Sequence, residues 1–192
     1  LMHIHIKQML YYLNKYNKRK LYNQILLITT NESLSKQHID ELALSKVSSI
    51  PFNKGNLSTF KDHIKVIEIT KLADQSGDKT VAVDCFESNN IIFVDEGHRG
   101  SSGEEWSARR NALANKGFTF EYSATFAQAV SKDKKLALEY SKAIIFDYSY
   151  KHFYGDGFGK DYKVLNLKEH FSELKYKYLI ACLLSYYQQK KI

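Results

Sequence analysis

The sequence predicts an α/β fold built on a mainly parallel sheet, and three observations support this prediction. Continuous apolar runs alternate with amphipathic segments from the amino terminus to about residue 150, which is the order of strands and crossover helices in such a sheet. The runs at 24–30 and 91–94 are rich in isoleucine, leucine or valine, as expected for strands covered on both faces. The chain has 192 residues, a length typical of one domain.

The first half of the chain begins with a predicted helix over residues 2–18. Four apolar residues recur there at the three- and four-residue spacing of an amphipathic helix: Ile6, Met9, Leu10 and Leu13. The run 24–30 predicts a strand, and Asn31 is placed to cap a helix over 32–44. A loop, a strand and a shorter strand are then expected, in this order, at residues 48–56, 64–70 and 79–86.

The second half continues the alternation. A strand over 91–96 precedes a helix over 103–117, which Gly117 is expected to end by taking the left-handed conformation. A strand, a helix and a further strand are expected, in this order, at residues 118–125, 133–142 and 143–150. Glycine-rich residues 152–162 predict a loop, and apolar residues at helical spacing predict a long helix over 168–189.

The charge of the chain favours an anionic partner. The formal net charge is +7 and the isoelectric point is near 9.2, and clustered lysines attract phosphate backbones. Basic residues gather at residues 14–20, at 131–135 and near the carboxyl terminus, although each cluster is equally well explained as a solvated surface.

Cysteine content and hydropathy indicate a reduced, cytoplasmic protein with no membrane partner. The two cysteines lie far apart and lack a C-x-x-C partner, so neither a disulfide framework nor a zinc site built on cysteine is indicated. No run of 18 apolar residues and no signal-peptide pattern is present.

Two adjacent carboxylates, Asp95 and Glu96, follow the apolar strand that begins at Ile91. In open α/β sheets, ligands bind beyond the carboxyl ends of the strands. A strand-end aspartate can hold Mg²⁺ against a phosphate, and a neighbouring glutamate can orient a water for attack on that phosphate. The alternative is that both acids cap a turn and face solvent.

Three segments in order resemble motifs of superfamily-two helicases. "VDEGH" at 94–98 matches the DExH variant of the Walker B motif, and "SAT" at 123–125 matches the family's third motif. "LLITTNESLSKQ" at 26–37 resembles the motif that touches the nucleic-acid backbone. Within the superfamily, the chain looks most like the helicase subunit of type III restriction enzymes and its DEAD/DEAH-box relatives.

The resemblance implies a three-layer P-loop NTPase (RecA-like) fold for residues 1–192, as the first motor domain of a helicase or translocase. It implies ATP as substrate, Mg²⁺ as cofactor, and DNA as partner, with RNA as the alternative. A DNA-modification subunit is a further implied partner. The predicted helix at 168–189 would lead towards a second motor domain.

Residue roles follow from the same resemblance. Asp95 would hold Mg²⁺ through water, Glu96 would activate the attacking water, and His98 would communicate with the next strand. The residues that couple ATP to nucleic-acid binding would be Ser123, Ala124 and Thr125. The residues on the nucleic-acid side would be Thr30, Asn31 and Gln37. The alternative for the two hydroxyl residues of "SAT" is a local bond from side chain to backbone.

The sequence contains no Walker A loop of the pattern G-x-x-x-x-G-K-[ST]. The closest segment, Gly155–Asp161, has one residue too few and places Asp161 where a metal-binding hydroxyl is needed. Residues 1–13 resemble the helix that follows the phosphate loop in this family. The expected fold therefore lacks the Walker A strand and loop, and we expect this chain alone to be inactive. The alternative function is a non-catalytic remnant that binds nucleic acid or a partner.

Other candidate residues have simpler interpretations. His3 and His5 lie two apart, which points them to different faces of a helix, so they do not predict a metal site as a pair. Trp106 is expected to take part in ordinary packing, with stacking on a nucleic-acid base as the alternative. Arg99, Arg109 and Arg110 flank the acidic pair and could steer phosphate, or form a charged helix face. No nuclease motif is present.

Overall fold

A computed structural model describes residues 1–56, 62–97, 104–126, 130–131, 133–160 and 175–190. The chain divides into two compact units, residues 1–147 and residues 148–192. The first unit contains a five-stranded sheet in the order β2-β3-β1-β6-β7, and every strand pair in it is parallel. This confirms the predicted α/β class.

This sheet contains five strands of three to five residues each. They are β1 (Ile25–Thr29), β2 (Ser49–Pro51), β3 (Ile64–Glu68), β6 (Ile91–Asp95) and β7 (Phe118–Tyr122). Every residue of β1 is buried, as are the first four of β3 and of β6. The continuous apolar character of β1 and β6 therefore reflects burial on both faces of the sheet.

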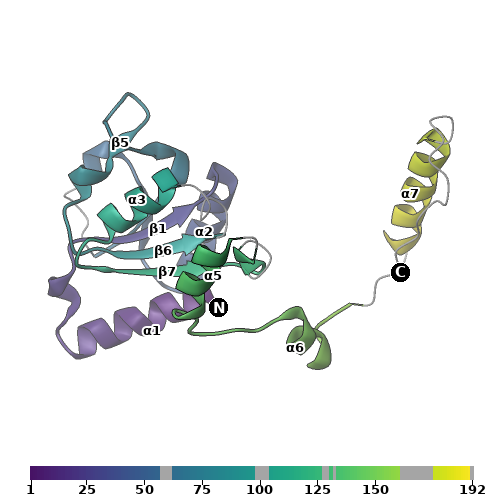
Figure 1. The fold of residues 1–192 in the computed structure, drawn as a ribbon, viewed down its shortest axis with the longest axis horizontal. Helices are drawn as coiled ribbons and strands as arrows, with labels where there is room; N and C mark the ends of the chain where they lie inside the picture. Colours follow the sequence, from purple (N-terminus) through teal and green to yellow (C-terminus); the bar gives the residue numbers. More distant parts are fainter. Residues whose placement is uncertain (57–61, 98–103, 127–129, 132, 161–174, 191–192) are drawn as a thin grey trace. The chain divides into compact units, whose positions relative to one another are not determined.

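Helices cover the two faces of the sheet and make three layers. Helices α1 (Met2–Lys15) and α2 (Glu32–Leu44) pack on one face, where Ile6 and Leu42 join the residues of β1 and β6 that point that way. Helix α3 (Glu104–Leu113) packs on the other face through Trp106 and Leu113. Figure 1 shows α1 and α3 on opposite sides of the sheet.

Short elements add buried residues to the core on the face of the sheet that α3 covers. Strands β4 (Leu72–Ala73) and β5 (Val81–Ala82) form a separate two-stranded parallel sheet. A 3₁₀ helix, η4 (Val83–Phe86), follows β5 and buries Phe86 in the same core cluster as Trp106. Three further 3₁₀ turns lie at η1 (Arg19–Leu21), η2 (Lys54–Asn56) and η3 (Ile69–Lys71). The strand predicted over 79–86 is thus only two residues long and lies outside the main sheet.

Most predicted helices are confirmed: α2 has the predicted bounds, whereas α1 and α3 are shorter than predicted. Asn31 caps α2 as predicted, because its side-chain oxygen accepts a hydrogen bond of 3.0 Å from the amide of Leu34. Helix α5 (Lys134–Ser141) lies within the predicted range and is capped by Asp133. Part of the predicted loop at 48–56 is instead the edge strand β2, in which Pro51 takes the last position, where a missing amide hydrogen is tolerated.

The predicted strand over 143–150 is wrong. Residues 143–149 form neither helix nor strand, and the apolar side chains of Ile144, Ile145 and Phe146 are exposed by 66%, 76% and 61%. A strand requires a neighbour for its backbone groups, and no pairing is found for these residues in the described part of the chain. Apolar composition alone was therefore not sufficient evidence of a strand.

Gly117 does not take the left-handed conformation that was predicted for it. Lys116 does, with φ of 62°. Glycine is needed at 117 for a different reason, since a Cβ there would lie 1.9 Å from the carbonyl oxygen of Asn90. The turn after α3 passes directly against the start of β6.

The second unit consists, in its described part, of helices α6 (Tyr150–Gly155) and α7 (Lys175–Lys190). Helix α6 occupies the start of the loop predicted at 152–162. The predicted helix over 168–189 is confirmed from Lys175, and its first residues lie outside the described part. None of the described helices is long and apolar enough to cross a membrane.

Candidate functional site

The carboxyl ends of β6 and β7 lie side by side at one edge of the sheet. The strands pair in parallel with Asp95 opposite Tyr122. Glu96 and Gly97 follow Asp95, and Ser123 follows Tyr122. The amide of Gly97 donates a hydrogen bond of 3.0 Å to the carbonyl of Tyr122, so the contact with β7 continues two residues beyond the end of β6. The structure thus brings the acidic pair next to the "SAT" tripeptide, as the sequence predicted.

Asp95 is held by a histidine that the sequence did not identify as part of the site. Nε2 of His38, on α2, lies 2.9 Å from Oδ2 of Asp95. Both side chains are mostly buried, with 9% of His38 and 22% of Asp95 exposed. The hydrogen bond from His38 lowers the pKa of Asp95 below its usual value and outweighs the opposing effect of burial. Asp95 is therefore an ionised carboxylate with a fixed orientation.

Glu96 adopts an uncommon backbone conformation. Its φ is 55°, in the left-handed region that glycine favours. Gly97 comes next, and a Cβ at this position would lie 2.9 Å from both Cβ and Oε2 of Glu121. The chain therefore turns sharply after β6 and passes close to β7. The predicted site residue His98 lies outside the described residues.

The hydroxyls of the "SAT" tripeptide make local hydrogen bonds. The amide of Thr125 donates to Oγ of Ser123 at 3.0 Å, and the two hydroxyl oxygens lie 3.4 Å apart. Ala124 is exposed. This is the bond from backbone to side chain that the sequence left open as the simpler alternative for these residues.

The residues predicted on the nucleic-acid side lie at the end of β1 and on α2. Thr30 follows β1, and Asn31 caps α2. Gln37 is exposed on α2 and donates a hydrogen bond of 2.9 Å to Oε1 of Glu41. The parallel pairing of β1 with β6 places Thr30 at the same edge of the sheet as Asp95, whereas Gln37 lies two turns into the helix.

A network of largely buried polar side chains includes Glu121, the residue before the last in β7. Glu121 accepts hydrogen bonds from Arg110 of α3 and, at 2.8 Å, from the hydroxyl of Tyr140 of α5. Burial, with the charge of Glu121, raises the pKa of Tyr140 to about 12, so this hydroxyl is a neutral donor. Arg109 pairs with Asp74 at 2.9 Å. Two of the three arginines that were candidates for phosphate steering, Arg109 and Arg110, thus bind protein carboxylates, and Arg99 lies outside the described residues.

His3 and His5 of α1 point to different neighbours, as the sequence predicted. Nδ1 of His5 contacts the hydroxyl of Tyr122, and its ring packs against Phe120. His3 instead lies against His38 and Glu41 of α2. Spacing along α2 was the signal that could have identified His38, since it stands four residues before the buried Leu42 and therefore on the same face.

The residues present suit a magnesium-bound phosphate only in part. Asp95, at the end of β6, supplies a mostly buried carboxylate, which is the kind of ligand that a hard cation prefers. The backbone amides, lysine and hydroxyl of a G-x-x-x-x-G-K-[ST] loop are absent from the sequence. The site can therefore supply the carboxylate side of a nucleotide site.

A family model described as "Type III restriction enzyme, res subunit" matches residues 3–128. The matched range includes the whole of the five-stranded sheet and every described site residue named above from the sequence. No curated protein matches the chain, and no solved structure matches it.

Proposed function

Because the chain belongs to the type III restriction enzyme res subunit family of helicase-like ATPases, we propose that it is part of a motor that hydrolyses ATP while bound to DNA. The observation that carries this proposal is that the carboxyl ends of two strands lie side by side. Asp95 is the last residue of β6, and Ser123 directly follows β7. Ligands of open α/β sheets bind at such an edge.

Asp95 is the proposed magnesium-holding residue, acting through water. Its carboxylate is the hard oxygen donor that Mg²⁺ prefers, and the hydrogen bond from His38 keeps it ionised and oriented. Magnesium bound to the nucleotide would neutralise charge on the phosphates during phosphoryl transfer.

Glu96 is the proposed residue that orients and polarises the attacking water. Its position directly after β6, at the carboxyl end of the parallel sheet, supports this role, because ligands of open α/β sheets bind there. The absence of a side chain at Gly97 lets the chain after Glu96 pass close to Glu121 of β7. His98 is proposed to pass the state of the nucleotide on to the neighbouring strand.

Ser123, Ala124 and Thr125 are the proposed coupling residues between ATP and nucleic acid. Their position beside Gly97, through the hydrogen bond to Tyr122, supports this role. Thr30, Asn31 and Gln37 are the proposed nucleic-acid contacts, and the amino terminus of α2 beside Thr30 presents amide groups suited to a phosphate.

DNA is the proposed nucleic acid, with RNA as the alternative. The net charge of +7 supports an anionic partner. Membership of a restriction-enzyme family supports a DNA-modification subunit as a further partner.

A second candidate function is supported by the net charge of +7, which favours an anionic partner whether or not a nucleotide binds. On this alternative the domain binds nucleic acid or a partner and does not use ATP. The two functions differ in nucleotide binding.

The experiment that separates them is a nucleotide titration on the chain joined, ahead of Leu1, to a strand and loop of the Walker A pattern. The motor function predicts binding of a fluorescent ATP analogue that requires Mg²⁺ and is weakened by Asp95→Asn. The alternative predicts DNA binding with no nucleotide binding. For DNA itself, the logarithm of the affinity should fall linearly with the logarithm of the salt concentration, and a slope near zero would contradict electrostatic binding.

A further inference from the structure

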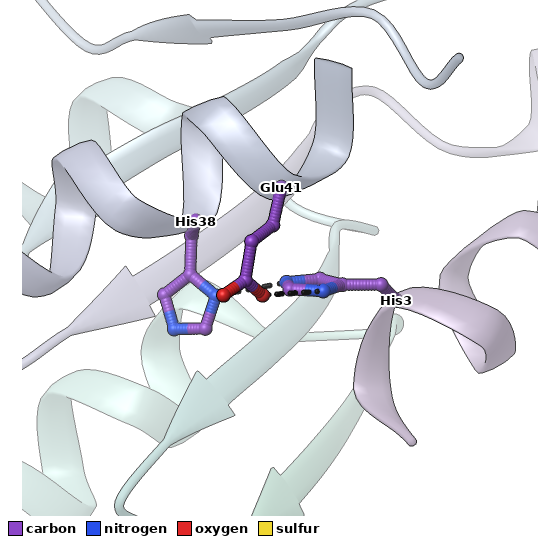
Figure 2. Close-up of side chains that lie close together, drawn as sticks. All are labelled: His3, His38 and Glu41. Carbon is purple, nitrogen blue, oxygen red and sulfur yellow. Dashed lines mark hydrogen bonds and ion pairs between the residues drawn. The ribbon is translucent and has the colours of Figure 1, made fainter. Parts of the chain in front are cut away.

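Two histidines and one glutamate converge where the amino-terminal part of α1 meets α2. His38 and Glu41 lie three residues apart on one face of α2, and His3 reaches them from α1 (Figure 2). One nitrogen or oxygen atom from each of the three side chains lies within 4.8 Å of the others. Nε2 of His3 lies 2.9 Å from Nδ1 of His38, and Nδ1 of His3 lies 3.1 Å from Oε2 of Glu41.

The hydrogen bonds of this cluster do not balance when both histidines are neutral. With the contact between His38 and Asp95, the chain Glu41–His3–His38–Asp95 has three short contacts. Each contact needs one hydrogen, and ionised carboxylates only accept. Two neutral imidazoles carry two N–H groups. One contact therefore lacks a hydrogen unless a ring carries an additional proton or a cation takes that place.

A metal ion would resolve this imbalance with the side chains already present. His38 would donate Nε2–H to Asp95 and present Nδ1 to the ion. Histidine ligands of metals usually donate their other ring N–H to a carboxylate in this way, which fixes the tautomer. The contact of 2.9 Å between His38 and Asp95 is an outer-shell bond of that kind.

We propose that His3, His38 and Glu41 bind a divalent transition-metal ion of the zinc class, with Asp95 as the outer partner of His38. Two imidazoles exclude Mg²⁺ and Ca²⁺ as the preferred ions, because these favour oxygen ligands. Bonds of about 2.0–2.1 Å place tetrahedral ligand atoms about 3.4 Å apart, and one ligand atom from each of the three side chains lies within 4.8 Å of the others. Glu41 is 43% exposed, so water can take a fourth position. The site does not depend on the proposed ATPase function.

The test is a titration of the 192-residue chain with Zn²⁺ alone, in competition with a chromophoric chelator and without nucleotide. Cys85 and Cys182 are exposed and free, so both are replaced by serine in the parent chain to remove thiol binding. We expect one ion per chain. Asp95→Asn, which changes the outer partner of His38, should weaken Zn²⁺ binding about 10–100-fold. Replacement of a ligand, by His3→Asn or Glu41→Gln, should weaken Zn²⁺ binding more.

Two matched variants serve as controls. Asp40→Asn removes an exposed charge beside Glu41 without removing a ligand, and His5→Asn removes a histidine from the same helix as His3. Neither should change the affinity for Zn²⁺. Because His38 is buried, its ligand atom is tested without substitution, by histidine ¹⁵N NMR of the zinc-bound chain, which should show coordination through Nδ1.

Several results would overturn the site. One is failure of the serine-substituted chain to bind Zn²⁺, which would assign the third hydrogen to a protonated histidine. Another is equal weakening by Asp40→Asn and Glu41→Gln. Coordination of His38 through Nε2 would also contradict it, because that atom is assigned to Asp95.

Discussion

The hydroxyl of Tyr140 donates a hydrogen bond of 2.8 Å to Oε2 of Glu121 and so ties helix α5 to the end of strand β7. The same hydroxyl accepts a hydrogen bond of 2.9 Å from Arg110 of α3. The Glu121 side chain is only 12% exposed. Three elements that are separate in the sequence therefore share one buried carboxylate directly behind the candidate site.

Tyr140→Phe should destabilise the chain, because it leaves a buried carboxylate oxygen and a buried guanidinium each short of one partner. Loss of hydrogen bonds to charged groups predicts a decrease of about 1.5–3 kcal/mol in the free energy of unfolding. Urea unfolding followed by circular dichroism measures it. Tyr11→Phe is the control, since Tyr11 is exposed, and it should change stability by less than about 0.5 kcal/mol. Equal effects of both substitutions would show that the network contributes no stability.

Gly117→Ala should destabilise the chain through a backbone collision. The added Cβ would lie 1.9 Å from the carbonyl oxygen of Asn90, which the start of β6 holds in place. Overpacking of this kind costs about 1–3 kcal/mol, and more where the neighbour cannot move. The matched substitution is Gly155→Ala, which would meet nothing within 4 Å. Unfolding midpoints in urea compare the two, and an undiminished midpoint for Gly117→Ala would refute the close approach.

Acidification should weaken the fold just below the usual histidine pKa. Burial lowers the pKa of His5, and burial together with His38 lowers the pKa of His3, below the usual value of 6.5. The unfolded chain therefore binds protons in this window that the folded chain does not bind. The stability contributed by neutral histidines is present above pH 6.5 and is lost as the pH falls towards the folded pKa values.

Urea unfolding at about pH 7.5 and about pH 5.5 measures this loss. His5→Asn, which keeps a polar atom near Tyr122, should make the pH dependence shallower. A stability that rises on acidification would mean that protonated histidines are favoured in the folded chain.

Much of the sheet could be predicted because a strand that is buried on both faces consists mainly of consecutive apolar residues. Strands β1 and β6 each begin with four consecutive apolar residues, β3 is apolar except at Lys65 and Glu68, and the apolar face of α1 recurs at helical spacing. The same approach failed at residues 143–150, because an apolar run records a tendency to be buried and does not supply the neighbouring strand. β2 was missed because three residues at a sheet edge carry little of this pattern.

The part of the candidate site that directly follows a strand could be predicted from the sequence. The contacts between residues far apart in the sequence could not. The position of Asp95 and Glu96 at the end of β6 follows from the strand itself. The contact of Asp95 with His38 joins residues 57 positions apart, and His3 joins them from a third element. Such contacts depend on how α1 and α2 pack on the sheet, which periodicity alone does not specify.

The most direct test of the proposed ATPase function is the effect of Glu96→Gln on ATP turnover with Mg²⁺, in the chain joined to a Walker A strand and loop ahead of Leu1. The 192-residue chain alone should show no turnover, because its sequence contains no such loop. Glu87→Gln is the matched control, since Glu87 is also a glutamate with positive φ, at 60° against 55° for Glu96, and it is exposed. Removing a residue that positions the attacking water predicts a loss of about 10²–10⁴-fold for Glu96→Gln and no loss for Glu87→Gln. Turnover that survives Glu96→Gln would contradict the assignment of the catalytic carboxylate.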